Sequence, residues 1–131
     1  MSISRNLSFL AGTLGSTGAV INTQEIVTVS NTASTGSINF DILTQSIMHY
    51  TANATSNWTL NIRGSSSNTF NSVVSANQSL TIAFLATQGA TAYYANVISI
   101  DSTTVTPKWA GGTAPTAGNA NSTDVYSLTI V

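Results

Sequence analysis

The 131-residue chain contains no cysteine, and only 5% of its residues are Asp, Glu, Lys or Arg. Without cysteine there is neither a disulfide framework nor a thiolate metal site, so packing and backbone hydrogen bonds must hold the fold together. Typical globular domains have about 25% charged residues. We therefore expect a surface that is wetted by Ser, Thr and Asn or covered by neighbouring subunits.

Long apolar runs and an excess of one charge are also missing. The formal net charge is −1 and no run of basic residues occurs, which argues against a nucleic acid as partner. No apolar run approaches the ~20 residues that span a bilayer, and no polybasic patch occurs, so no membrane partner is expected. The first residues lack the pattern of a signal peptide. Hydrophobic residues make up 42% of the chain, which argues against disorder.

The first 22 residues differ in composition from the rest of the chain. The stretch 12–18 is rich in Gly, Ser and Thr and predicts a connector. A short apolar group precedes it, and the sequence leaves open whether this group is a helical turn or an extended arm. We predict an N-terminal extended arm or connector at 1–22, followed by one β-sandwich domain at 23–131. The predicted interface residues of the arm are Arg5, Leu7, Phe9 and Leu10.

From residue 24 onward, apolar and polar residues alternate with a period of two. The pattern is clearest in three triplets, which are Ile38, Phe40 and Ile42; Trp58, Leu60 and Ile62; and Tyr126, Leu128 and Ile130. Such alternation is typical of strands that place one row of side chains in a core. Further strands are expected at 25–30, 46–51, 69–75, 79–87, 93–100 and 104–109. About eight or nine strands with Ser, Thr, Asn and Gly breakers predict an all-β fold, an antiparallel β-sandwich of jelly-roll-like type.

Candidate catalytic groups are few. His49 is the only histidine and has no neighbouring carboxylate in the sequence, so we interpret it as a structural residue on a strand. The carboxylates are spread along the chain, at Glu25, Asp41, Asp101 and Asp124. Glycosidases need two facing carboxylates and hard cations need clustered oxygens, and this spacing predicts neither. We therefore predict that the protein is not an enzyme and has no catalytic residue, no metal site and no cofactor.

Aromatic residues are the remaining candidates for recognition. Trp58 is in phase with Leu60 and Ile62, which predicts a core position. Tyr93 and Tyr94 are adjacent, so on a strand one of them faces outward, where it can anchor a protein interface or stack on a sugar. We predict Tyr94 as an interface residue, with a sugar platform as the alternative.

The stretch from Pro107 to Thr116 predicts a structural turn. A strand ends in a tryptophan, a pair of glycines allows positive φ, and a proline then breaks the ladder. The residues of this turn are Trp109, Gly111, Gly112 and Pro115.

The same stretch reads Lys-Trp-Ala-Gly-Gly-Thr-Ala-Pro from Lys108 to Pro115, and Asp124-Val125-Tyr126 follows after a polar gap. It resembles a module that is common in tail-fibre and other virion proteins of tailed phages, often marine and cyanobacterial ones. The pattern of that module is approximately Lys-Trp-x-Gly-Gly-Thr-x-Pro, followed by Asp-x-Tyr or Asp-x-Phe. The likeness extends over most of residues 24–131, and the Trp109 turn is its specific part.

The resemblance implies a structural role in the virion and no chemistry. We predict a non-enzymatic protein of a tailed bacteriophage particle that decorates or cements the head, docking through its N-terminal arm and sandwich edges. The alternative is a tail-fibre or receptor-binding module that recognises a host surface carbohydrate. The expected partners are other capsid or tail proteins and further copies in a homo-oligomer, for which a trimer suits both fibres and three-fold capsid sites.

Overall fold

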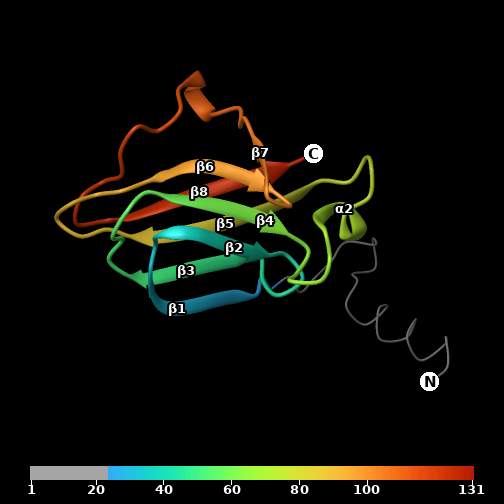
Figure 1. Cartoon of the computed structure of the whole chain (residues 1–131), viewed down its shortest axis with the longest axis horizontal. Coiled ribbons are helices and arrows are strands. Elements are labelled where there is room, and N and C mark those ends of the chain that lie inside the picture. The colour runs from blue at the N-terminus through green and yellow to red at the C-terminus, as the bar shows by residue number, and fades with distance from the viewer. Residues whose placement is uncertain (1–23) are drawn as a thin grey trace, which may run out of the picture.

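The computed structural model describes residues 24–131 as two β-sheets that form a sandwich. Its strands are β1 (Val27–Ala33), β2 (Gly36–Asp41), β3 (Ile47–Ala52), β4 (Trp58–Arg63), β5 (Leu80–Thr87), β6 (Ala95–Ile100), β7 (Thr103–Val105) and β8 (Thr123–Ile130). A helical turn α2 (Phe70–Val73) separates β4 from β5, and a 3-10 turn η1 (Ala110–Gly112) precedes β8. The strand orders are β1-β3-β5-β8 and β2-β4-β6-β7 (Figure 1). The prediction of an all-β sandwich is confirmed.

Consecutive strands from β1 to β6 lie in alternate sheets, so the chain crosses the sandwich after each of the strands β1 to β5. The pairs β1–β2, β3–β4 and β5–β6 thereby form three successive coils. Equivalent strands of neighbouring coils pair in parallel: β1 with β3, β3 with β5, β2 with β4, and β4 with β6. Of the described strands, β7 and β8 alone run antiparallel to their neighbours, which are β6 and β5.

The predicted antiparallel pairing is therefore wrong for four of the six strand pairs. The topology also differs from the antiparallel Greek keys of a jelly roll. A period of two reports only that a strand buries one face, and it does not report the direction of the neighbouring strand. Parallel sheets are usually covered on both faces and then have continuous apolar runs. In this sandwich each sheet covers only the inner face of the other, so its parallel strands alternate as antiparallel strands do.

Backbone hydrogen bonds also join the connections of one coil to those of the next. Thr55 N donates to Ser34 O over 3.1 Å, and Ala54 N donates to Thr87 O over 2.9 Å. These bonds pair polar backbone groups that the crossing between sheets would otherwise bury without partners. The three coils are thus stacked through their connections as well as through their strands.

An aromatic cluster joins the two sheets in the centre of the sandwich. Trp58 of β4 is 1% exposed, and its ring makes edge contacts with Phe84 of β5 and Tyr126 of β8, with centroids 6.0 and 5.8 Å apart. Tyr50 of β3 contacts Phe84 in the same manner, at 5.4 Å. Such pairs contribute about 0.5–1.5 kcal/mol beyond the burial of their area. The predicted core position of Trp58 is confirmed.

The segment 69–75 was expected as a strand, and the structure places α2 there instead. Thr69 is the N-cap, and its hydroxyl accepts the N–H of Ser72 at 3.3 Å. The carboxylate of Asp101, which lies between β6 and β7, accepts the N–H of Phe70 at 2.8 and 3.0 Å. A cap from a distant part of the chain and the burial of Phe70 decide this turn. Periodicity cannot separate helix from strand in so short a segment.

The strand expected at 104–109 ends at Val105, and Trp109 lies in the loop that follows. Val105 pairs with Ile98 of β6 at the end of β7. Two residues further, Pro107 lacks the N–H that an extended ladder would need. The strand therefore ends before Pro107, earlier than the alternation predicts.

Candidate docking surfaces

The predicted interface residues of the N-terminal arm, Arg5, Leu7, Phe9 and Leu10, lie outside the described residues, as does the whole predicted segment 1–22. Their role stays a prediction. Tyr94 is half-buried just before β6, and its N–H donates to the side-chain oxygen of Asn57 at 3.1 Å. Its predicted role as an interface residue is likewise not tested by any contact of the single chain.

Three of the four carboxylates hold parts of the fold together. Asp41 forms an ion pair with Arg63, with 2.6 Å between Oδ1 and Nε, and this hydrogen bond raises the pKa of Arg63 above its ordinary value. Asp101 caps α2, as described above. Asp124 belongs to a buried network, and Glu25 is exposed in the segment before β1. Asp41, Asp101 and Asp124 are thus each bound to a partner that holds the fold together.

The buried network gives Asp124 and Tyr126 structural roles at the start of β8. Asp124 accepts hydrogen bonds from Gln88 Nε2 at 2.9 Å and from Asn119 Nδ2 and N at 2.6 and 3.1 Å. The Tyr126 hydroxyl accepts the N–H of Ala95, the first residue of β6, at 3.1 Å. Burial raises the pKa of Tyr126. Asp124 and Tyr126 therefore tie β8 to the connection that leads into β6.

Gly118 completes this network because it allows the loop before β8 to approach closely. A Cβ at this position would collide with the carbonyl oxygen of Tyr93 and would lie 2.8 Å from Asp124 Oδ2. Backbone atoms cannot move aside as the end of a flexible side chain can. The close approach therefore requires glycine.

His49 lies on β3, as expected, and its side chain is directed to the outer face of the sheet. Its Nε2 is 3.5 Å from the Thr87 hydroxyl oxygen of β5. Within residues 24–131, no three His, Asp or Glu side chains gather as they would around a metal ion. No helix of this described region has the length and apolar character needed to cross a membrane.

A groove of about 240 Å³ separates β6 from the loop that follows β7. Trp109 and Pro115 of the predicted structural turn line one wall. Between them, Gly111 and Gly112 have φ of 78° and 77°, and Gly112 N donates to Trp109 O at 2.9 Å. Tyr94 and Asn96 line the other side. Asn96 is exposed, at an irregularity where β6 has one more residue than β4. The lining residues of the groove include no charged side chain.

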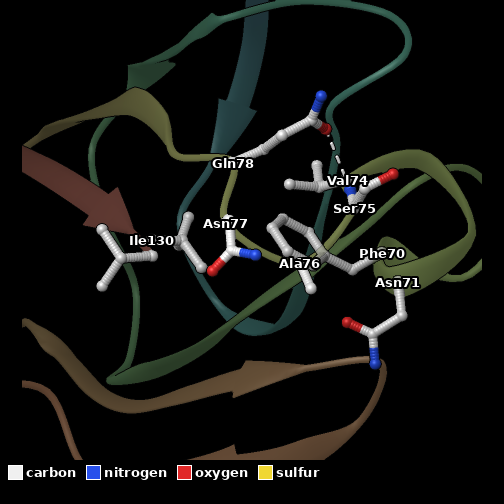
Figure 2. Close-up of a pocket in the computed structure, with 9 residues that line it drawn as sticks. Phe70, Asn71, Val74, Ser75, Ala76, Asn77, Gln78 and Ile130 are labelled. Atoms are coloured by element: carbon white, nitrogen blue, oxygen red, sulfur yellow. Dashed lines mark hydrogen bonds between the residues drawn. The ribbon is translucent and has the colours of Figure 1, made fainter.

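A second hollow, of about 420 Å³, lies between α2 and the end of β8 (Figure 2). Phe70, Val74 and Ile130 supply its apolar part. The carboxamide oxygen of Gln78 accepts the N–H of Ser75 at 2.9 Å, so this polar group is engaged in the turn between α2 and β5. Among the described residues that line the hollow, none has an ionisable side chain.

The outer face of the sheet β2-β4-β6-β7 is polar. Asn61 in the middle of β4 donates through Nδ2 to Asn39 Oδ1 of β2 at 2.9 Å, and its Oδ1 accepts the hydroxyl of Ser99 of β6 at 2.9 Å. The Asp41–Arg63 pair lies in the same register further along these strands. We call these five residues the polar face. Its polar groups satisfy one another, and Asn61 is only 4% exposed.

The outer face of the sheet β1-β3-β5-β8 is largely apolar. The strand registers place two rows of outward side chains across all four strands. We call these two rows the apolar face. The first row is Val27, Ile47, Ala83 and Ser127, and the second row is Val29, His49, Leu85 and Val125. Val27, Val29 and Val125 are 48%, 64% and 61% exposed. Three of the most exposed large hydrophobic residues of the described chain therefore lie on one surface.

Sequence reasoning did not identify the apolar face. In β8 a signal was available, because Val125 is out of phase with the inward row that begins at Tyr126. In β1 the signal was misleading, since the two valines have the spacing of a core row. Their polar neighbour Thr28 faces inward instead, where its hydroxyl donates to the buried Gln45 carboxamide at 3.0 Å.

The fold and these surfaces define the class of protein as a two-layer β-sandwich with three coils and mainly parallel pairing. No protein-family model, curated protein or solved structure matches the chain. The function is therefore inferred from the surfaces themselves.

Proposed function

We propose that the protein is a non-enzymatic structural component of a tailed-phage particle, which docks on other virion proteins through the apolar face. The observation that supports this best is the exposure of Val29 and Val125 on a face without a charged side chain. Contiguous exposed apolar patches on a protein surface commonly mark sites of protein–protein docking. The likeness of the Lys108–Pro115 stretch to phage virion modules supports virion proteins as partners and a head decoration or cement role.

The positions of the ionisable groups support a role without chemistry. Asp41, Asp101 and Asp124 are each engaged in hydrogen bonds that hold the fold. His49 has the Thr87 hydroxyl as its polar neighbour. A general acid or base needs a position and a partner suited to proton transfer, and these contacts favour structural roles for all four groups.

The sandwich edges support docking as a second element of the proposal. β1 and β2 are the outermost strands at the same end of the two sheets, and each is paired on one side. β1 contains no charged residue and no proline, which are the usual protections of an edge strand against pairing with another chain. A strand of a neighbouring virion protein could extend the sheet there.

The test is binding to particles that lack the protein, measured by co-sedimentation. Val125→Lys and Val29→Lys each place a charge on the apolar face, and we expect either to weaken binding about tenfold or more, equivalent to about 1.4 kcal/mol. Leu43→Lys is the matched control, because Leu43 is 57% exposed in the turn that follows β2, outside the four strands of the apolar face. Normal binding of both valine variants would contradict the proposal.

A separate variant addresses the proposed docking arm. Removal of residues 1–22 is expected to abolish particle binding while the sandwich still gives the circular dichroism of the full chain. Normal decoration by this truncated protein would remove the arm from the proposal and leave the apolar face in it.

The groove beside Trp109 favours a second candidate function, a tail-fibre or receptor module that binds a host carbohydrate. Tyr94 supplies an aromatic ring and Asn96 a carboxamide to an uncharged groove. Binding of the purified protein to a glycan array, lost in Tyr94→Ala and retained in the exposed control Leu43→Ala, would support this candidate. Absence of binding to any glycan would count against it.

A further inference from the structure

We infer that the groove beside Trp109 is a docking slot for a peptide strand, in which an extended, uncharged segment of another virion protein adds to the edge of β6. The groove belongs to the other sheet from the apolar face, so the inference goes beyond the docking proposed for that face. Only the identity of the partner as a virion protein rests on the proposed function.

The first support is an unpaired part of β6. The strand β7 pairs only with the second half of β6, in a register that runs from Ile98 opposite Val105 to Ile100 opposite Thr103. Residues 95–97 lie beyond this register and line the groove, and we call them the half-edge. Among the described residues, no backbone hydrogen bond joins the half-edge to the loop after β7. An open strand edge of this kind presents main-chain donors and acceptors that an added strand satisfies.

The next residues of the chain itself do not fill the half-edge. One and two steps beyond the pair Ile98–Val105, the same register would place Thr106 opposite Val97 and Pro107 opposite Asn96. Proline has no N–H to give to a ladder. The loop departs from the sheet at this point and arches away from it (Figure 1). The half-edge therefore stays available to a segment from outside.

An irregularity of β6 lies at the same place. Trp58 of β4 pairs with Ala95, and Thr59 pairs with Val97, so Asn96 is an extra residue between them. Such bulges interrupt the ladder and re-aim a side chain, and they are frequent beside functional sites. Asn96 is exposed and lines the groove. Its carboxamide is thus placed to bind a main-chain group of an incoming strand.

The opposite wall of the groove is largely apolar. Trp109 and Pro115 line it, and both are half-buried. The turn between them is closed by the hydrogen bond from Gly112 N to Trp109 O. Where a strand edge has such a wall beside it, main-chain hydrogen bonds give affinity for an extended peptide and the wall selects its side chains. The open edge of β1 has strand groups as well, but the half-edge of β6 has both elements.

These features select a peptide strand over a sugar as the occupant. An extended peptide repeats its donors and acceptors in step with those of a strand edge, whereas the hydroxyls of a sugar lack this repeat. The lining residues of the groove include no charged side chain, so a charged group of the occupant would lose its hydration without a counter-charge. The occupant is therefore uncharged, has no proline where it pairs with β6, and has an apolar side chain against Trp109.

An NMR titration of the isotope-labelled full chain with the peptide acetyl-Ser-Val-Thr-Val-Ser-amide tests the inference. We expect the amide signals of residues 95–97 and the indole signal of Trp109 to shift, with a Kd on the order of 1 mM, because the half-edge offers few main-chain hydrogen bonds. Two peptides that are methylated on alternate backbone nitrogens are the controls. A strand pairs with its neighbour through every second residue, so one of them should bind at least about fivefold more weakly and the other should bind as the unmodified peptide does.

Ala114→Lys and Ala110→Lys form a matched pair of variants. Both alanines are exposed in the same loop, and of the two only Ala114 lines the groove. Ala114→Lys places a long charged side chain in the slot and should weaken peptide binding about tenfold or more. Ala110→Lys should bind the peptide as the unmodified protein does, and circular dichroism checks that both variants are folded.

Each of three results would overturn the inference. Signals of residues 95–97 that do not shift up to about 10 mM peptide, tenfold above the expected Kd, would exclude the slot. Equal binding of the two methylated peptides would exclude strand pairing. Shifts that the oligosaccharide cellotriose produces and the peptide does not would assign the groove to carbohydrate binding instead. The titration needs no particle, so its failure leaves the docking of the apolar face standing, and that docking is refuted separately by the valine variants.

Discussion

The two outer faces of the sandwich differ in how their side chains are satisfied. On the polar face, Asn61 is directed outward and yet is only 4% exposed, because Asn39 and Ser99 on the neighbouring strands bind its carboxamide. On the apolar face, Val125 is 61% exposed and has no polar group to offer. One face thus contributes to folding through its own hydrogen bonds, and the other leaves apolar area free for a partner. An outward position in a strand therefore does not by itself identify a docking residue.

Both faces depend on one core, and breaking it gives the largest expected effect. Phe84 is fully buried between the sheets and contacts Trp58 and Tyr50. Phe84→Ala should lower the free energy of unfolding by about 3–5 kcal/mol, since it leaves a cavity that the core can only partly close. Urea denaturation followed by tryptophan fluorescence and by far-UV circular dichroism should give coincident transitions. Leu43→Ala, at a residue 57% exposed, is the control and should change stability by less than about 0.5 kcal/mol.

The contribution of the polar face to folding is tested by Asn61→Ala. Its Oδ1 also accepts the N–H of Ser102 at 2.8 Å, so truncation leaves the donors of Ser99 and Ser102 and the acceptor Oδ1 of Asn39 without their partner. The expected loss is about 1–3 kcal/mol in urea denaturation, with particle binding unchanged. The matched substitution Val125→Thr should do the reverse, with weaker binding and a stability change within about 0.5 kcal/mol. Equal effects of the two variants on stability would remove the contrast between the faces.

Alkaline pH should lower the stability of the folded chain through two tyrosines of the interior. Burial raises the pKa of Tyr50 and of Tyr126 in the folded chain. The unfolded chain therefore loses these protons first, near pH 10, and stability falls as the pH rises from there through the folded pKa values. Urea midpoints measured at pH 8 and above pH 10 check this slope, which should be shallower in Tyr126→Phe. Stability that is constant above pH 10 in the unmodified protein would contradict the prediction.

The smallest expected effect is that of the Asp41–Arg63 pair on the polar face. The two side chains are each 26% exposed, and solvent-accessible ion pairs typically contribute about 0.2–1 kcal/mol. A double-mutant cycle with Asp41→Asn and Arg63→Gln should give a coupling in this range that decreases in high salt. A coupling well above about 1 kcal/mol would show that the Asp41–Arg63 pair stabilises the polar face more than a solvent-accessible ion pair is expected to do.

Sequence reasoning located most strands but not their partners. The triplets that begin at Ile38, Trp58 and Tyr126 supplied inward rows of β2, β4 and β8, and Trp58 is a core residue as predicted. The turn before β5 was predicted as a strand because its cap, Asp101, is 31 residues from Phe70 in the chain. Of the docking residues, only Val125 had a sequence signal, namely its position out of phase with its neighbours.

The sequence by itself determined an all-β fold without disulfides, the approximate positions of most of its strands, and the inward rows that contain Phe40, Trp58 and Tyr126. These properties follow from alternation and composition, which act over a few neighbouring residues. Only the tertiary structure decided the parallel coils, the inward orientation of Thr28, and the near-complete burial of Asn61 on an outer face. Each of these depends on which distant strand lies alongside, and the same local alternation is compatible with several neighbours.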